Sequence, residues 1–162
     1  MRYQFVIFSL LSLVVTSSSI AQTTAPVASL KAFASSTDVT NLIAKAKADK
    51  KEGQAIVVET ILALAPYKAN LEYRTLVGPA AIHEKEVEFF YVIDGKGTMV
   101  IGGTLVNETR QNAENLSGSG IEGGTSTALA KGDFLVVPQN TAHWVNSVDG
   151  TLVLMSLHVP RQ

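Results

Sequence analysis

The chain contains no cysteine, so neither a disulfide framework nor thiolate chemistry is available to it. Charged residues make up only 17% of the sequence, and the formal net charge is −1. Nucleic acid or an anionic membrane surface would call for a strongly basic patch, so this balance argues against both partners. Without disulfides, the fold must be held together by packing alone, or by packing together with a metal.

The first 21 residues have the pattern of a secretory signal peptide. Arg2 supplies the positive start, Phe5 to Val15 is mostly apolar, and Ser19-Ile20-Ala21 offers the small residues that a signal peptidase requires. The alternative is a membrane anchor, but the apolar stretch is shorter than the roughly 20 residues that span a bilayer. We therefore expect a mature chain that begins at Gln22, a periplasmic or secreted location, and no membrane association after cleavage.

The mature chain is expected to form one domain behind a flexible leader at residues 22–36, which are rich in Ala, Ser and Thr. A helix is predicted over about residues 38–51, capped by Thr37 or Asp38 and ended by Gly53. Its apolar stripe is modest and consists of Leu42, Ile43 and Ala46.

Short β-branched and alternating runs fill residues 55–159, with Asp94-Gly95 and Asp149-Gly150 among the turn signals between them. This pattern predicts an all-β sandwich or barrel. The polar segment 107–126 interrupts the regular succession of predicted strands, and we expect it to be a mobile insertion.

Two motifs about fifty residues apart carry the chemistry. The first runs from His83 to Gly95 and includes Glu88, and the second runs from Gly132 to His143. Two imidazoles and a carboxylate, brought together from separate strands, are a natural set of ligands for a divalent metal. The alternative is that both histidines are hydrogen-bonded structural residues.

The spacing of these motifs resembles that of the cupin superfamily. In the first motif four residues separate a His from a Glu and six more separate the Glu from a Gly, which matches His83, Glu88 and Gly95. The second motif matches at Gly132, Pro138 and His143, with Asn140 in place of a glycine. The family's first histidine is absent, because Ala81 stands at its position.

The resemblance implies an all-β, cupin-type antiparallel β-barrel of jelly-roll topology with a short N-terminal helix. It also implies one divalent metal ion, with Fe, Mn, Zn or Ni as candidates, held by His83, Glu88 and His143. The expected function is chemistry on a small organic molecule at that metal, of the isomerase, lyase or dioxygenase type. The alternatives are a non-catalytic module that binds a small molecule, and a barrel without metal.

Other residues are weaker candidates. Glu86 is expected to act as an acid or base if it lies inside the barrel unpaired, whereas pairing with Lys85 at the rim would favour the binding module. Arg74 is a candidate for binding a ligand carboxylate if its strand face looks inward. The full substrate-binding set that we expect is Arg74, Glu72 and Phe90. His158, far from both motifs in the sequence, is expected to be structural.

A row of apolar side chains should face outward from the strand that carries Glu88. The row consists of Phe89, Tyr91 and Ile93, and Trp144 can extend it. A small barrel cannot bury both faces of one strand, and the predicted helix is short. The sequence therefore predicts a homodimer built on this outer face, with a monomer covered by the helix as the alternative.

Overall fold

The computed structural model describes residues 31–161. The predicted signal peptide and most of the predicted leader lie outside the described residues. Within residues 31–161, no helix combines the length and the apolar character needed to cross a membrane.

Helix α1 spans Ser36–Asp49, two residues earlier at both ends than predicted. The N-cap is Ser35, whose side-chain oxygen accepts a hydrogen bond from the Asp38 backbone nitrogen at 3.1 Å. Asp38 accepts one from the Ser35 backbone nitrogen at 2.8 Å, which completes a capping box. Asp38 is therefore the third residue of the helix and not its cap, and the helix ends before Gly53.

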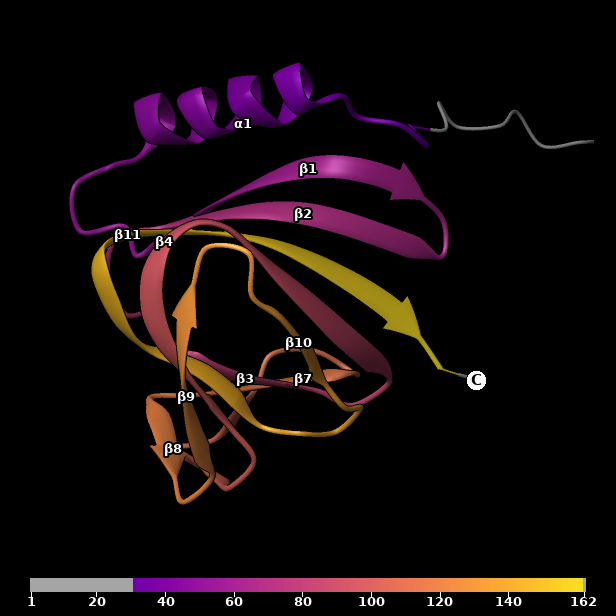
Figure 1. The fold of residues 1–162 in the computed structure, drawn as a ribbon. Helices are drawn as coiled ribbons and strands as arrows, with labels where there is room; N and C mark the ends of the chain where they lie inside the picture. Colours follow the sequence, from indigo (N-terminus) through magenta and orange to yellow (C-terminus); the bar gives the residue numbers. More distant parts are fainter. Residues whose placement is uncertain (1–30, 162) are drawn as a thin grey trace, which may run out of the picture.

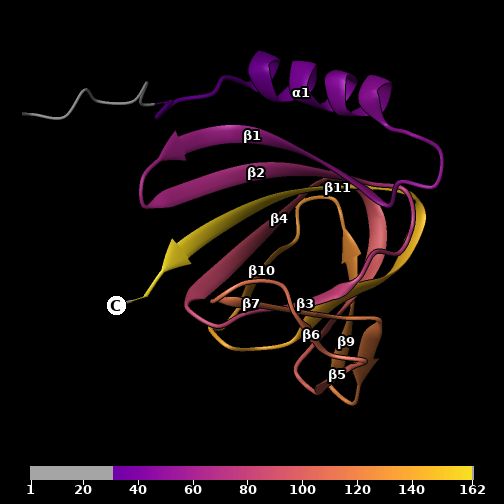
Figure 2. The same ribbon diagram turned by 180° about the vertical axis from the view of Figure 1, so that it is seen from behind.

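The rest of the described chain is mainly β-structure, which confirms the predicted fold class. The strands are β1 (Ile56–Leu64), β2 (Tyr67–Arg74), β3 (Ala80–His83), β4 (Glu86–Ile101), β5 (Thr104–Val106), β6 (Thr109–Arg110), β7 (Asn115–Gly118), β8 (Gly120–Glu122), β9 (Thr125–Ala130), β10 (Phe134–Val137) and β11 (His143–Pro160). All their pairings are antiparallel, and nine of them form one sheet that curls around an interior (Figures 1 and 2).

Segment 107–126 is mostly strand and not the loop that we expected. It carries β6, β7 and β8, and β7 pairs with β3 through four residue pairs. Backbone pairing therefore holds this segment against the strand that contains His83.

Strands β4 and β11 are also longer than predicted, because two expected turns are bends inside them. Gly95 has a φ of +86°, and a Cβ atom there would lie 1.9 Å from the carbonyl oxygen of Thr151 on β11. The pairing register shifts between Val148 and Leu152, which brackets Asp149-Gly150. Glycine serves here to bring two bulged strands together, and such bulges increase the curvature of a sheet.

Two apolar clusters lie on opposite faces of the curled sheet. The interior cluster consists of Phe90, Val92, Met99, Leu129, Val137, Val145, Leu152 and Leu154. The second cluster lies between the sheet and α1, which covers β1 and β2 (Figure 1). Alternation along β2 explains the division, because Ala69, Leu71 and Tyr73 pack toward the helix while Asn70 and Glu72 between them face inward. The predicted helix stripe is confirmed: Ala46 is buried, and Leu42 and Ile43 pack beside it.

Trp144 does not extend the outward apolar row. Its indole nitrogen donates a hydrogen bond to the carbonyl oxygen of Gly78 at 2.9 Å. Its ring packs on a small third cluster formed by Ala80, Leu105, Leu116 and Ala142. The side chain thus closes one end of the curled sheet, away from Phe89 and Tyr91.

Candidate metal centre

All three histidines of the chain converge on one buried carboxylate. The Nε2 atoms of His83 and His143 lie 3.3 and 3.1 Å from Glu88 Oε2. The Nε2 atom of His158 lies 3.2 Å from Glu88 Oε1. Glu88 is only 2% exposed. The structure therefore brings together the three predicted ligand residues and adds a fourth, His158, for which we had expected a structural role outside this site.

Strand curvature brings His143 and His158 to the same carboxylate. They stand fifteen residues apart at the two ends of β11, which would be about 50 Å in a straight strand. Three register shifts between β11 and β4 bend the strand around the interior. The β11–β4 register then pairs His158 directly with Glu88, and the β11–β3 pairing sets His143 opposite Ala81.

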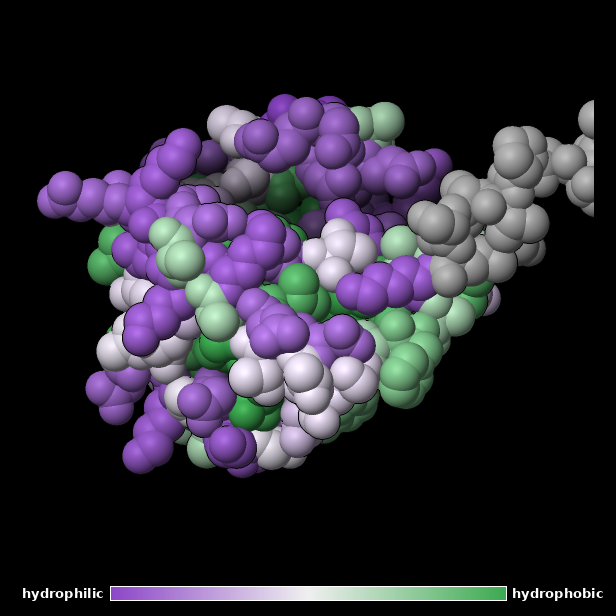
Figure 3. All heavy atoms as spheres, turned by 90° about the horizontal axis from the view of Figure 1, so that it is seen from above, coloured by the Kyte–Doolittle hydropathy of each residue, from purple (hydrophilic) through white to green (hydrophobic). Residues whose placement is uncertain are grey.

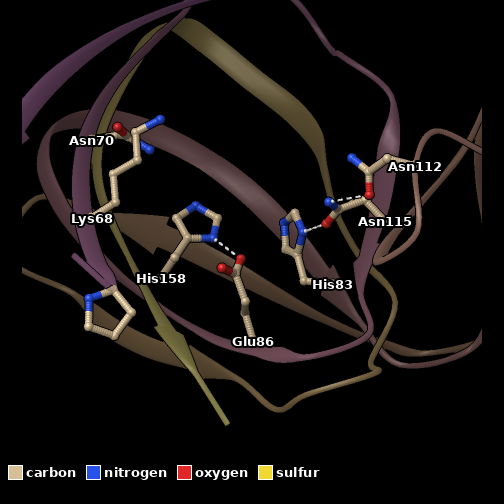
Figure 4. A pocket seen from close by; sticks show the side chains of 8 residues that line it. Lys68, Asn70, His83, Glu86, Asn112, Asn115 and His158 are labelled. Atoms are coloured by element: carbon tan, nitrogen blue, oxygen red, sulfur yellow. Dashed lines mark hydrogen bonds and ion pairs between the residues drawn. The ribbon is translucent and has the colours of Figure 1, made fainter. Parts of the chain in front are cut away.

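The other ring nitrogen of each histidine faces an oxygen. His158 Nδ1 lies 2.9 Å from Glu86 Oε2, and His83 Nδ1 contacts Asn115 Oδ1 (Figure 4). His143 Nδ1 lies 3.4 Å from the carbonyl oxygen of Thr141. An oxygen partner requires the hydrogen to be on Nδ1, so a neutral ring presents an unprotonated Nε2 to the centre. This is the arrangement by which proteins orient histidine ligands.

Electrostatics couples His83 and Glu88. Burial would raise the pKa of Glu88, but the imidazoles of His143 and His83 outweigh it and hold the pKa well below its usual range. Burial lowers the pKa of His83, but Glu88 and Asn115 outweigh it and raise the pKa from 6.5 to about 9. Without metal, His83 is therefore protonated at neutral pH and forms an ion pair with Glu88.

We expect the metal-free protein to lose stability as the pH rises from about 6.5 to about 9. The folded-state pKa of His83 lies above its unfolded value, so protonation stabilises the fold fully below pH 6.5. That contribution disappears as the pH passes the folded-state pKa, and it amounts to at most about 3 kcal/mol. Urea unfolding in a chelator at several pH values measures it. His83→Gln should flatten the profile, and a flat profile in the unsubstituted protein would contradict the ion pair.

The donor set fits a divalent metal. A carboxylate buried this deeply is costly unless positive charge compensates it. Glu88 Oε2 makes no hydrogen bond of ordinary geometry with residues 31–161, although the nitrogens of His83 and His143 are close to it. Ligand atoms that approach one another without such hydrogen bonds are suited to a shared ion. The ligand atoms of His83, Glu88 and His158 all lie within 4.8 Å of one another. Imidazole and carboxylate ligands suit Zn, Fe, Mn and Ni.

The cluster opens on a cavity of about 390 Å³. The side chains around it are Pro66, Lys68, Asn70, His83, Glu86, Asn112, Asn115 and His158 (Figure 4). The carboxylate of Glu86 lies in this cavity, but it is neither unpaired nor paired with Lys85, because His158 holds it. Lys85 instead lies 3.6 Å from Glu114 at the surface.

The predicted substrate-binding residues are not among the residues that line this cavity. Arg74 does face inward, but it forms an ion pair with Glu72 at 2.6 Å, and both are mostly buried. Phe90 is 1% exposed and belongs to the interior cluster, with its ring 6.0 Å from that of His143. These three side chains fill the barrel interior and leave the cavity to other residues.

Four residues around the cavity were missed or assigned no role from the sequence. Lys68 and Asn70 share the inward face of β2 with Glu72, so alternation along the strand was the available signal. Asn112 and Asn115 belong to the segment that we had expected to be mobile. Asn115 Nδ2 donates to Asn112 Oδ1 at 2.9 Å, which fixes the amide that holds His83.

No family model and no curated protein matches the sequence. The structure is similar to that of KdgF from Halomonas sp., with a TM-score of 0.51 and 17% identity over 70% of this chain and 87% of that chain. It is also similar to TT1209 from Thermus thermophilus, with a TM-score of 0.51 and 13% identity over 72% of this chain and 93% of that chain. A cupin superfamily protein from Desulfitobacterium hafniense gives a TM-score of 0.48 at 13% identity, over 70% of this chain and 84% of that chain.

The two structures with a TM-score of 0.51 show a likeness of fold alone, which agrees with the curled antiparallel sheet and with the spacing of the two motifs. The chain therefore has the cupin fold.

Proposed function

We propose that the protein is an exported cupin that binds one divalent metal and carries out chemistry on a small organic molecule beside it. The metal ligands are His83, Glu88 and His143, together with His158, which takes the place of the histidine that Ala81 replaces. The observation that carries this proposal is the convergence of three imidazoles on one buried carboxylate at the wall of a cavity.

The residues around the centre have separate tasks. Glu86, Asn115 and the Thr141 carbonyl fix the three rings, so that each Nε2 stays directed inward. When bound, the metal supplies Lewis-acid or redox chemistry, of the isomerase, lyase or dioxygenase type. The curled sheet keeps water away from the inner side of the centre, and the cavity gives a substrate access from the other side.

A non-catalytic binding module is the second candidate, and the position of Glu86 favours it. An acid or base that acts on substrate must be able to exchange a proton with it. Glu86 already accepts a hydrogen bond from His158, so it acts first as a positioning residue. Turnover of candidate substrates by the metal-loaded protein distinguishes an enzyme from a module that only binds.

Metal analysis tests the proposal most directly. Protein purified without added metal, then dialysed, should retain close to one divalent ion per chain. A metal content near zero, combined with no thermal stabilisation by added Zn, Fe, Mn or Ni, would contradict the metal centre.

Export rests on the pattern of residues 1–21, which lie outside the described residues. Mass spectrometry of the protein from its native host should give a chain that starts at Gln22. A mature protein that retains Met1 would show that the segment is not cleaved.

A homodimer is supported by apolar side chains that α1 leaves uncovered. Phe134, Val136 and Tyr91 are 64%, 46% and 39% exposed on the paired strands β10 and β4. Phe89 packs beside Phe134 with ring centroids 6.1 Å apart, while Ile93 is partly covered by the helix cluster. Figure 3 looks onto the helix side and shows hydrophobic residues still visible between the hydrophilic ones.

We expect Phe134→Asp to convert the mature protein from dimer to monomer at micromolar concentration, because it places a charge within an apolar interface. Light scattering would measure a fall from twice the mass of one chain to the mass of one. Leu76→Asp, at a residue 47% exposed in the turn after β2, is the control and should leave the mass unchanged. A monomeric unsubstituted protein would rule the dimer out.

A further inference from the structure

Most of the residues that line the cavity beside the metal centre have polar side chains. Seven of its eight lining residues have polar side chains, and Pro66 is the exception. Pockets for apolar ligands are lined mainly by hydrophobic and aromatic groups, with only a few polar ones. The lining residues therefore favour a ligand that carries several hydrogen-bonding groups.

One wall of the cavity supplies a positive charge that has no partner within the described part of the chain. Lys68 lies directly opposite His158 in the pairing of β2 with β11. Lys68 is exposed to solvent and, like Lys47 and Lys96, has no carboxylate of residues 31–161 within ion-pair distance of its Nζ. An anionic group on a ligand would give Lys68 its counter-charge.

Asn70, the next inward-facing residue after Lys68 on β2, has an amide oxygen without a hydrogen-bond partner within residues 31–161. Asn70 lines the cavity although its residue is only 6% exposed, and its Oδ1 has no hydrogen-bond partner among the described residues. Ser156, directly opposite on β11, is fully buried, and its Oγ also has no partner there. Buried polar atoms cost free energy unless they are paired. Because Oδ1 is shielded from solvent, the group that Asn70 offers to the cavity is its amide nitrogen, which would donate a hydrogen bond to a ligand hydroxyl.

The charge around the cavity fits the same ligand. Lys68 and a divalent metal would bring three positive charges, and the carboxylates of Glu86 and Glu88 bring two negative ones. With neutral histidines, the loaded site therefore keeps one positive charge. Across the cavity from Lys68 and Asn70, the amide nitrogen of Asn112 offers a further donor for a hydroxyl, while the Asn115 amide is engaged with His83 and Asn112 (Figure 4).

We propose that this site takes a small hydroxylated carboxylic acid, with its carboxylate near Lys68 and a hydroxyl group on Asn70. The inference rests on the proposed metal centre, which balances the two glutamates. It also assigns Lys68 the ligand-binding role that the sequence had suggested for Arg74.

Three six-carbon probes test separately whether the site recognises the carboxylate and whether it recognises the hydroxyl groups. Calorimetry on the metal-loaded protein compares gluconate, sorbitol, which lacks the carboxylate, and hexanoate, which lacks the hydroxyls. Gluconate should bind at least about tenfold more tightly than either. Equal affinity for gluconate and sorbitol, or for gluconate and hexanoate, would overturn the proposal.

Two variants then locate the contacts. Lys68→Met keeps the aliphatic stem, and it should weaken gluconate about tenfold while changing sorbitol by less than about twofold. Asn70→Leu should weaken gluconate and sorbitol but not hexanoate, without loss of stability, because it removes an unpaired buried atom. Lys131→Met, at an exposed residue paired with Asp94, is the control and should bind gluconate normally. Unchanged gluconate affinity in Lys68→Met would also overturn the proposal.

Metal content measured in the same samples keeps the two proposals separate. A sample that holds its metal but shows no preference for gluconate contradicts the ligand class and leaves the metal centre standing. A sample that prefers gluconate without holding metal contradicts the metal centre and supports the ligand class.

Discussion

Glu88→Gln is expected to abolish stoichiometric metal binding and to leave the fold intact. Glutamine has nearly the same size, but it lacks the negative charge toward which all three imidazoles converge. We expect the affinity for divalent metal to fall by at least about a hundredfold, because even residues that only orient ligands are worth ten- to a hundredfold. A metal present at a hundred times its dissociation constant stabilises the fold by about 2.7 kcal/mol, and the variant should lose that gain.

Glu84→Gln is the matched control for this experiment. Glu84 precedes β4 by two residues and pairs with Arg110 at 2.7 Å, but on the surface. Exposed pairs contribute at most about 1 kcal/mol, so this variant should keep its metal and most of its stability. Elemental analysis after dialysis, and thermal unfolding with and without metal, provide the measurements. A full complement of metal in Glu88→Gln would refute the centre as described.

The fold could be predicted from local patterns, but its turns could not be placed reliably. Alternation and β-branched runs identified the strands, because strands with one buried face must alternate. The same patterns placed turns at Asp94-Gly95 and Asp149-Gly150, where the structure has bulges. Glycine is required in both situations, because both need a positive φ or a close backbone approach. Only the partner strand decides between them, and Gly95 meets Thr151 more than fifty residues away.

The candidate site, too, could be predicted only in part from the sequence. His83, Glu88 and His143 could be identified because two motifs of fixed spacing contain them. His158 could not, because its approach to Glu88 depends on the bending of β11 around the whole interior. The sequence left open whether Arg74 faces inward; it does, but it lies at a different depth from the cavity. It stands six residues, or about 20 Å along the strand, from Lys68 at the cavity. Alternation defines the face of a strand and carries no information about depth.

The position of Ala81 allows the role of His158 to be tested by exchange. His158→Ala should lower metal affinity by at least about tenfold, since it removes one of four ligand side chains. Ala81 lies opposite His143 and alternates in phase with His83, so a side chain at residue 81 shares the inward face. We therefore expect Ala81→His, added to His158→Ala, to restore most of the lost affinity. Competition with a chromogenic chelator measures all three proteins without reference to any activity.

The control adds a histidine elsewhere to the same His158→Ala protein. Thr127→His suits this purpose, because Thr127 is exposed on β9 and does not line the cavity. It should give no recovery, which excludes a general effect of an extra imidazole. If His158→Ala binds metal as tightly as the unsubstituted protein, His158 is not a ligand and the centre has only His83, Glu88 and His143. The other outcome is that His158→Ala loses metal affinity and Ala81→His restores none of it. Residue 81 then does not reach the centre, and only β11 can supply a ligand at the position of His158.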